Sequence, residues 1–337
     1  MADRGLILAL LRGGGFVSGA EMGQRLGVSR AMVRKEVGAL EAAGCRIEAV
    51  TGRGYRLLAL PDRPLPEVMA ALWHGREGYP VRFLPEVAST MQMAGDWARA
   101  GAPAGATVVT DHQTAGRGRR GRNWQDPPGE ALLASLVLRP GLPAGEAGWL
   151  PLAVAVGAAR ALREVTGLAP GIKWPNDLLH EGRKLAGILV ELTLDEQEVR
   201  YAVAGLGMNV HQQDFPEEIR ARATSLRLAC GYGGNRAELL AALVPSVLAA
   251  VRQLEEDPAA LKAAWREQSV TLGHEVAILG VPGAAQGLAV DVDDLGRIVL
   301  EGPDGVPRAF AAGEISLGQA GSDGPNGSTG ASSSHRM

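Results

Sequence analysis

The sequence predicts an α+β protein of several domains, and three observations support this prediction. A basic N-terminal segment has helical periodicity and ends at the proline-rich stretch P-D-R-P-L-P, residues 61–66. From about residue 67 to 270, apolar runs typical of strands mix with helical stretches, as in an α+β or α/β core. Short alternating runs from Thr271 onwards indicate a small β-barrel. We expect domains at 1–62, 63–270 and 271–318, then a disordered Gly/Ser-rich tail at 319–337.

The composition and net charge argue against one class of protein, chains that coat nucleic acid. Of the 337 residues 46% are hydrophobic and 21% charged, and a net charge of -3 argues against a chain that coats nucleic acid along its whole length. The first 63 residues nevertheless hold ten Lys and Arg against six Asp and Glu, which predicts a small basic module on an acidic body.

Cysteine usage and the early apolar residues bear on the compartment. Cys45 and Cys230 lack CxxC or Cys/His spacing, so neither a disulfide framework nor a zinc site is expected. The run Leu6–Leu11 is too short to span a bilayer and lacks the flanks of a signal peptide. We therefore expect a cytoplasmic protein with no membrane partner.

The first module has the spacing of a helix-turn-helix. A short helix near Leu6–Leu11 precedes the capping-box pair Ser18 and Glu21, which starts a second helix that Gly27 interrupts. Ser29 can cap a third helix, in which apolar residues recur at i, i+4 and i+7. A turn T-G-R-G between two short apolar runs, 45–50 and 55–60, then predicts a β-hairpin wing.

Basic residues lie on the free face of the third helix and at the tip of the wing. This distribution favours winged DNA binding over a generic three-helix oligomerisation module with a solvated basic face. The residues expected to contact DNA are Ser29, Arg30, Arg34, Lys35 and Arg53.

The central domain should contain several buried strands and helices. Strands are expected at Ala106–Thr110, Ala131–Leu138, Gly187–Leu192 and Tyr201–Val210, and an apolar-faced helix at Leu150–Val165. A further helical stretch runs from Asn235 towards Trp265, and we expect Pro245 to kink or restart it.

The stretch T-A-G-R-G-R-R-G-R-N-W, residues 114–124, combines four arginines with three glycines inside the predicted core domain. Taken alone, it can be a solvated surface loop, a strip that grips nucleic acid or a mobile cradle for a phosphate-bearing ligand. The remaining motifs are needed to choose among these three.

Two later motifs favour the cradle. In K-W-P-N-D-L the proline makes a rigid turn and leaves Asn176 and Asp177 where an amide and a carboxylate can meet a metal ion and phosphate oxygens; a well-capped turn is the alternative. In R-K-L-A-G-I-L-V-E, Lys184 precedes a strand in which Gly187 removes a side chain. A lysine at such a position can also be merely solvated.

Glycines recur in a second strand, and hydroxyls lie upstream. A-G-L-G-M-N-V places Gly205 and Gly207 on one face of a strand, followed by Asn209. Two strands floored by glycine predict a slot for a ligand. Ser89 and Thr90 supply paired hydroxyls at the end of another predicted strand.

In order and spacing these motifs, with the late G-E-I-S-L at 313–317, resemble those of bacterial biotin protein ligases of the bifunctional kind, which also repress the biotin operon. The resemblance covers residues 5–318. It implies a winged helix-turn-helix, a central mixed-sheet catalytic domain like those of class II synthetases and biotin ligases, and a C-terminal SH3-like β-barrel.

The resemblance implies a two-step reaction that uses biotin, ATP and Mg²⁺. Biotin is first activated to biotinyl-5'-AMP, and a lysine of the biotin carboxyl carrier protein of acetyl-CoA carboxylase then displaces AMP. The implied catalytic residues are Lys184, Arg119 and Asp177. Asn176, Asn209, Arg122 and Trp124 join Arg119 and Asp177 at ATP or the adenylate, and Asp177 is also the candidate magnesium ligand.

The implied biotin site combines polar and small residues. The ureido ring needs fixed donors and acceptors, for which the resemblance offers Ser89, Thr90, Gln113 and the backbone around Gly116 and Arg117. Lys184 takes the biotin carboxylate, whereas Gly187, Gly205 and Gly207 let the rings and the valeryl chain lie against the sheet. Trp124 is expected to close over the ligand.

Two positions depart from the family pattern. Met91 follows the Ser-Thr pair where family members commonly have asparagine, and Gly318 stands where some relatives carry an arginine that reaches the adenine. A lipoate-type ligase and a catalytically silent biotin-sensing repressor are the rival interpretations. The resemblance also implies that the adenylate-bound chain forms a homodimer on biotin operon DNA.

Overall fold

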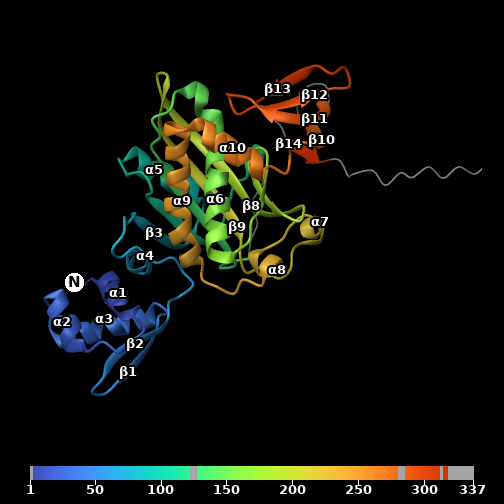
Figure 1. Cartoon of the computed structure of the whole chain (residues 1–337). Coiled ribbons are helices and arrows are strands. Elements are labelled where there is room, and N and C mark those ends of the chain that lie inside the picture. Colours follow the sequence, from blue (N-terminus) through green and yellow to red (C-terminus); the bar gives the residue numbers. More distant parts are fainter. Residues whose placement is uncertain (1–2, 122–123, 125–126, 280–284, 312–313, 318–337) are drawn as a thin grey trace, which may run out of the picture.

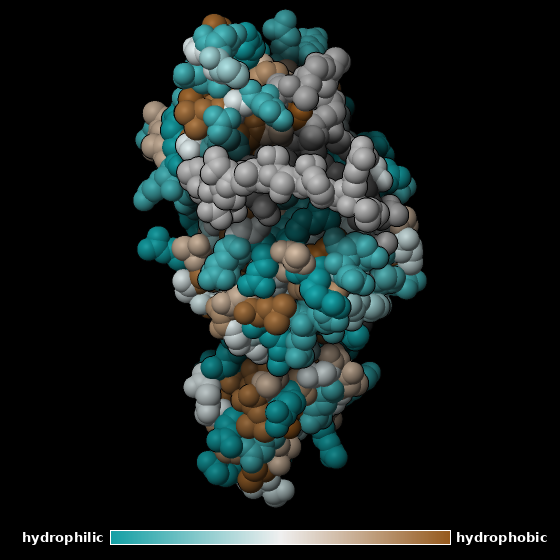
Figure 2. Space-filling model, turned by 90° about the vertical axis from the view of Figure 1, so that its right-hand side faces the viewer, coloured by the Kyte–Doolittle hydropathy of each residue, from teal (hydrophilic) through white to brown (hydrophobic). Residues whose placement is uncertain are grey.

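The computed structural model describes residues 3–121, 124, 127–279, 285–311 and 314–317. Figure 1 shows a blue N-terminal module at one end of a larger body and an orange-red C-terminal sheet near the opposite end. In Figure 2 the N-terminal module forms the lower lobe of an elongated molecule. The order of these parts agrees with the predicted one, whereas their residue boundaries stay predictions.

The N-terminal module has the predicted winged helix-turn-helix elements. Its helices are α1 (Arg4–Leu11), α2 (Gly19–Leu26) and α3 (Arg30–Ala42), and its antiparallel hairpin consists of β1 (Arg46–Val50) and β2 (Gly54–Ala59). The hydroxyls of Ser18 and Ser29 accept hydrogen bonds from the backbone N–H groups of Glu21 and Met32, which confirms both predicted caps. Gly27 ends α2 in the left-handed conformation.

A seven-stranded mixed sheet forms the centre of the body, in the order β3-β4-β5-β9-β8-β7-β6. The strands are β3 (Val81–Val87), β4 (Thr107–Gln113), β5 (Ala131–Leu138), β6 (Gly171–Lys173), β7 (Asp177–His180), β8 (Arg183–Asp195) and β9 (Glu198–Asn209). Only the pair β3 and β4 is parallel. All eight residues of β5 are buried, because helices cover the sheet on both faces.

Helix α5 (Thr90–Arg99) packs on one face of this sheet, against β4, β5 and β9. Helices α6 (Leu150–Thr166) and α9 (Arg236–Glu256) pack against each other on the opposite face (Figure 1). Gly157 permits their close approach, since a Cβ there would lie 2.6 Å from the Cα of Val247. Shorter helices complete the body: α4 (Pro66–Leu72), α7 (Glu217–Arg220), α8 (Leu226–Cys230) and α10 (Pro258–Gln268), with 3-10 turns η1 (Arg119–Gly121) and η2 (Ala144–Trp149).

Helix α9 excludes one of the two alternatives predicted for Pro245, a restart of the helix. Pro245 does not restart the helix, which continues through it to Glu256; the restart comes at Pro258, where the Asp257 carboxylate caps the N–H of Ala260. Helix α9 is also long and apolar enough to cross a membrane. Half of that apolar window is buried inside the body, where α9 packs on α6.

The C-terminal domain is an antiparallel sheet in the order β13-β12-β11-β10-β14. Its strands are β10 (Glu275–Leu279), β11 (Ala285–Val292), β12 (Ile298–Glu301), β13 (Pro307–Phe310) and β14 (Glu314–Leu317). Within the described residues β13 and β14 stand at opposite edges and do not pair. The predicted closed SH3-like barrel is therefore not confirmed, although the β-rich domain is.

Candidate active site

The candidate active site lies on the face of the central sheet that α5 covers. Strands β3 and β4 are parallel, and Val87 pairs with Gln113 at their carboxyl ends. The chain leaves β3 through Ser89 and Thr90, which begin α5, and leaves β4 through Gln113, which begins the arginine-rich loop. Parallel pairing thus brings these three predicted biotin contacts to one edge of the sheet.

Within the part of the chain that the structure describes, a hydrogen-bond cluster joins Thr90 and Gln113 to Ser135 and does not include the Ser89 side chain. The amide oxygen of Gln113 accepts from the backbone N–H of Thr90 at 2.9 Å and from its hydroxyl at 3.1 Å, and the hydroxyl of Ser135 donates to Thr90 Oγ1 at 2.8 Å. Sequence reasoning missed Ser135. Its signal was a lone hydroxyl in the apolar strand A-L-L-A-S-L-V-L, where a buried polar group needs a partner.

The two glycines predicted to floor a slot lie side by side on neighbouring strands. Gly187 of β8 pairs with Gly207 of β9, and Trp124 lies over both: Cβ atoms there would be 3.2 Å and 2.7 Å from its indole carbons. The indole Nε1 of Trp124 is buried without a partner among the described residues. Gly205 differs, because a Cβ there would meet Met91 Sδ at 2.6 Å. Met91 therefore fills the space over Gly205, whose assignment to biotin stays a prediction.

Lys184 and Asp177 form an ion pair at the edge of the slot. The Lys184 Nζ lies 2.8 Å from Asp177 Oδ1 and 5.7 Å from the centroid of the Trp124 ring. A Cβ at Gly187 would lie 3.0 Å from this Nζ, so the absence of a side chain at Gly187 gives the ammonium group its room. The predicted catalytic lysine and carboxylate are thus in contact although β7 and β8 contribute them separately.

The arginine-rich loop reaches the same region. Arg119, on η1, donates to the side-chain oxygen of Asn176 at 3.3 Å, while the amide of Asn176 donates to the Ile188 carbonyl at 2.8 Å. Arg117 is exposed, and Gly116 is buried where the Trp124 N–H donates to its carbonyl at 3.1 Å. Arg122 lies outside the described residues, so its assignment to the pyrophosphate stays a prediction.

Asn209 is buried and holds the surrounding backbone together. Its side-chain amide donates to the Thr224 carbonyl at 2.9 Å, and its oxygen accepts from the Gln212 amide at 3.3 Å. These bonds give Asn209 a structural role beside the slot. Its predicted contact with the adenylate remains a prediction.

No group of three or more His, Cys, Asp or Glu side chains that could hold a metal ion occurs within the described residues. Asp177 is a single carboxylate, and it is paired with Lys184. One carboxylate can suffice for a magnesium ion that is held mainly by substrate phosphates and water. The donor set therefore fits a magnesium ion brought by a nucleotide and does not fit a closed metal site.

The winged module exposes all five residues predicted to contact DNA. Arg30, Arg34 and Lys35 project from α3, Ser29 caps it, and Arg53 lies at the tip of the hairpin. The Arg53 guanidinium lies 4.1 Å from the centroid of the Phe16 ring, and that of Arg56 lies 4.9 Å from the same ring. Phe16 thus orients two wing arginines through cation–π contacts.

Comparison with known protein families finds matches to three segments of the chain, in the order of its three structural parts. Residues 83–209 match the biotin/lipoate A/B protein ligase family, residues 4–56 match a helix-turn-helix domain, and residues 271–318 match the biotin protein ligase C-terminal domain. The fold and the site together define a protein ligase of the biotin/lipoate class that carries a helix-turn-helix domain.

Two similar proteins and one solved structure identify the family more closely. The bifunctional ligase/repressor BirA of Bacillus subtilis is 34% identical over 91% of this chain and 95% of its own length. The biotin–[acetyl-CoA-carboxylase] ligase of Mycobacterium tuberculosis is 35% identical over 58% of this chain and 73% of its own. The structure of an Aquifex aeolicus biotin protein ligase with biotin and ATP aligns with a TM-score of 0.61, at 30% identity, over 72% of this chain and 99% of that one. The chain belongs to the family of BirA bifunctional ligase/repressors.

Proposed function

We propose that this chain joins biotin to a lysine of a biotin carboxyl carrier protein at the expense of ATP and also represses transcription in response to biotin. One observation carries the ligase assignment: Lys184, paired with Asp177, lies at the mouth of a glycine-floored slot. The other end of the predicted site carries the polar cluster of Thr90, Gln113 and Ser135. A cation at one end and fixed polar groups at the other suit a ligand with a carboxylate tail and a neutral polar head.

The reaction proceeds in two steps. In the first, an oxygen of the biotin carboxylate bonds to the α-phosphorus of ATP, the bond from that phosphorus to the bridging oxygen breaks, and pyrophosphate leaves. In the second, a lysine amine of the carrier attacks the acyl carbon, AMP leaves, and the amine loses a proton as the amide forms. Both steps concentrate negative charge near the reacting atoms, so cationic groups must hold the substrates together.

Lys184 binds the biotin carboxylate and the α-phosphate, exchanging its bond to Asp177 for these anions. Arg119 binds the phosphates and retains the adenylate, and Arg122 contacts the pyrophosphate end. Asn176 and Asp177 contact nucleotide phosphates, and Asp177 also holds Mg²⁺. The magnesium ion supplies charge neutralisation to the phosphates when it is bound.

The ureido ring of biotin takes its hydrogen bonds from Ser89, Thr90, Gln113 and the backbone at Gly116 and Arg117. The intact bonds of the Thr90–Gln113 pair support this role, because they fix a donor and an acceptor before the ligand arrives. A site that hydrogen-bonds a ureido group should reject lipoate, which lacks one, by about 10⁴-fold.

Loop closure protects the intermediate. An acyl-adenylate hydrolyses if water reaches it, so the loop must cover the ligand once it has formed. Gly121 has a φ of 72°, a conformation that L side chains rarely adopt, and it lies where the loop leaves η1. Trp124 covers the slot at Gly187 and Gly207, and the arginines make closure depend on an anionic ligand.

Repression rests on the winged module. We infer that biotinyl-5'-AMP promotes a homodimer that places two winged modules on an inverted repeat in biotin operon DNA, contacted by Ser29, Arg30, Arg34, Lys35 and Arg53. The carrier protein and a second copy of the chain then compete for the adenylate-bound form. Sedimentation and DNA binding with and without the adenylate test this inference, which fails if the adenylate-bound chain stays monomeric at micromolar concentration and its DNA affinity does not change.

Biotin-dependent exchange of pyrophosphate into ATP tests the ligase chemistry. Lys184→Ala should lower kcat/KM by at least about 10²-fold, because it removes the cation at the reacting carboxylate. Lys262→Ala is a matched control: Lys262 also pairs with an aspartate, Asp294, at 2.7 Å and lies 5.3 Å from the Trp149 ring, but outside the slot. Equal loss in both variants would contradict the assigned role of Lys184.

A further inference from the structure

Trp174 lies beside the catalytic turn without facing the slot. It occupies the second position of K-W-P-N-D-L, between β6 and β7, and only 2% of it is exposed. Its neighbours two and three positions on are Asn176 and Asp177, which contact Arg119 and Lys184. The function proposed above uses these neighbours and leaves Trp174 unexplained.

Both hydrogen-bond donors of Trp174 reach the C-terminal domain. Its backbone N–H donates to the Thr271 hydroxyl at 2.9 Å, and its indole Nε1 donates to the Gly296 carbonyl at 3.1 Å. Both bonds are buried, and Thr271 is fully buried. Buried hydrogen bonds of this kind hold both partners in place, because a donor or acceptor left unpaired in the interior costs its full desolvation free energy.

The turn that receives the indole is itself held in place. Gly296 has a φ of 76°, and a Cβ there would lie 2.4 Å from the Gly148 carbonyl oxygen, so this turn and the start of α6 are in close contact. A second indole, that of Trp149, donates to the Asp293 carbonyl of the same turn at 2.8 Å. The turn between β11 and β12 thus accepts one indole hydrogen bond from Trp149 and one from Trp174.

Further hydrogen bonds join the segment that follows Trp174 to strand β8. The Asn176 amide donates to the Ile188 carbonyl at 2.8 Å, and the Ile188 N–H donates back to the Asn176 carbonyl at 2.9 Å. These two bonds dock the far end of the turn on β8, and the bonds of Trp174 dock its near end on the C-terminal domain. Asp177, which follows directly, is the first residue of β7 and pairs with Lys184.

We propose that Trp174 is a positioning residue for adenylation, through which the C-terminal domain sets the placement of Asn176 and Asp177. This inference rests on the proposed function, since it assigns the two residues to ATP. The C-terminal sheet then contributes to the first step indirectly, through Trp174, and the turn between β11 and β12 does not itself contact the substrates. Displacement of catalytic groups by about 1 Å can cost on the order of 10²-fold in rate.

Two matched variants of the full chain test the proposal. Trp174→Phe removes the indole donor at Gly296 and keeps an aromatic ring in the buried site. Trp149→Phe removes the equivalent donor at Asp293, from an indole that is equally buried and binds the same turn, but that lies at the start of α6. Each variant removes one indole hydrogen bond from the junction, buried at Gly296 and part-buried at Asp293, and only the first touches the catalytic turn.

In biotin-dependent ATP–pyrophosphate exchange, Trp174→Phe should lower kcat by about 10-fold. The KM for biotin should stay within about twofold, because the polar cluster at Thr90 and Gln113 is untouched. Trp149→Phe should keep kcat within about twofold of the natural chain, although its melting temperature falls by a similar amount to that of Trp174→Phe. This contrast separates positioning from loss of folded protein.

A normal kcat for Trp174→Phe, or equal losses in both variants, would overturn the proposal. If Trp174→Phe does not fold, Thr271→Val is the second test, because it removes the hydroxyl that accepts from the Trp174 backbone N–H. It should give the same selective loss of kcat. A normal kcat for Thr271→Val would also overturn the proposal. Failure of the natural chain to exchange pyrophosphate would instead sink the proposed adenylation chemistry, which makes the two failures distinguishable.

Discussion

The winged module meets the catalytic body through apolar packing of α1 on α4 and through charged side chains near the linker, whereas the C-terminal sheet meets it through two buried indoles and their hydrogen bonds. At the first junction Asp62 accepts from the guanidinium and backbone N–H of Arg236 and lies 3.1 Å from the His211 ring nitrogen. Arg236 is 4% exposed at its side chain and also pairs with Asp111 at 2.9 Å. Asp111 in turn binds Arg63 of the linker at 2.7 Å.

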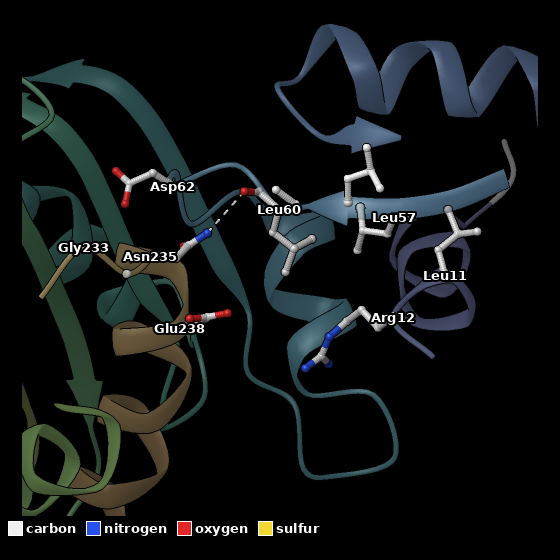
Figure 3. A pocket seen from close by; sticks show the side chains of 11 residues that line it. Leu11, Arg12, Leu57, Leu60, Asp62, Gly233, Asn235 and Glu238 are labelled. Carbon is white, nitrogen blue, oxygen red and sulfur yellow. Dashed lines mark hydrogen bonds between the residues drawn. The ribbon is translucent and has the colours of Figure 1, made fainter. Parts of the chain in front are cut away.

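An open cavity of about 480 Å³ lies beside these ion pairs (Figure 3). Leu11, Leu57 and Leu60 of the winged module line it on one side and Asn235 and Glu238 of the body on the other. The Asn235 amide reaches across to the Pro61 carbonyl at 2.7 Å. This interface thus combines open space beside its ion pairs with apolar packing of α1 on α4.

The C-terminal junction is closely packed where its two indoles bind. Trp149 and Trp174 are nearly fully buried and bond to the same turn, and Gly148 lets that turn come within contact distance of the body. Its ion pairs, such as Arg266 with Asp291 at 2.7 Å, lie at the solvent-exposed rim. The two junctions thus differ in chemistry: ion pairs beside an open cavity join the linker of the winged module to the body, whereas two buried indoles join the C-terminal sheet to it.

The largest expected effect comes from Arg236→Met. This change removes the buried guanidinium that joins Asp62 to Asp111, and breaking such a buried network costs about 3 kcal/mol. Denaturant unfolding should show this loss. Pyrophosphate exchange by the folded fraction should be nearly normal, since the slot is not touched, and an equal loss of exchange would break the distinction between the two junctions.

A smaller effect is expected for Asp62→Asn. Burial alone would raise the pKa of Asp62, but hydrogen bonds from His211 and Arg236, with the charge of Arg236, outweigh it and lower the pKa below the usual 3.8. A lowered pKa stabilises the folded state above pH 3.8, and that stability is lost as the pH falls through the folded-state pKa. The side chain is 38% exposed, so we expect only about 1 kcal/mol at neutral pH.

Two measurements check the Asp62 prediction. Unfolding free energy, followed from pH 7 into the acid range, should fall less steeply for Asp62→Asn than for the natural chain. Operator DNA affinity should weaken in the variant while ligase activity is kept. If the pH profiles superimpose, Asp62 does not stabilise this junction as a carboxylate.

The smallest effect belongs to Arg266→Gln at the rim of the C-terminal junction. The arginine is 40% exposed and its partner Asp291 46%, and exposed pairs of this kind contribute about 0.5 kcal/mol. We expect unfolding free energy and kcat both to stay close to those of the natural chain. A fall in kcat as large as that of Trp174→Phe would show that ion pairs, and not the indoles, hold this domain in place.

Much of the fold could be predicted because local patterns dictate it. Ser18 and Ser29 cap their helices as expected, and the apolar run Ala131–Leu138 is a strand with the predicted bounds. Pro245 does not restart its helix, since tertiary packing of α9 on α6 overrides the tendency of proline to end a helix, and the predicted kink stays a prediction. The open order of the last sheet depends on strand pairing over long separations, which periodicity does not reveal.

Residues of the site could be predicted where a motif indicates their chemistry, but contacts between residues of neighbouring strands could not. Lys184 and Asp177 could be named from their motifs, but their contact follows from the pairing of β7 with β8. Ser135 and Met91 enter the site through the register of β5 and β9 and the position of α5. Trp174 acts through another domain, and nothing in its hexapeptide indicates which backbone its indole will meet.

The central claim is that this chain transfers biotin to a carrier through a site built around Lys184. Intact-protein mass spectrometry of a biotin acceptor domain, incubated with the chain, ATP, Mg²⁺ and either biotin or lipoate, tests it most directly. We predict the addition of one biotin to one acceptor lysine, with no addition from lipoate and none with Lys184→Ala. Tight binding of biotin without any transfer would contradict the claim and make the chain a biotin sensor that has lost its ligase activity.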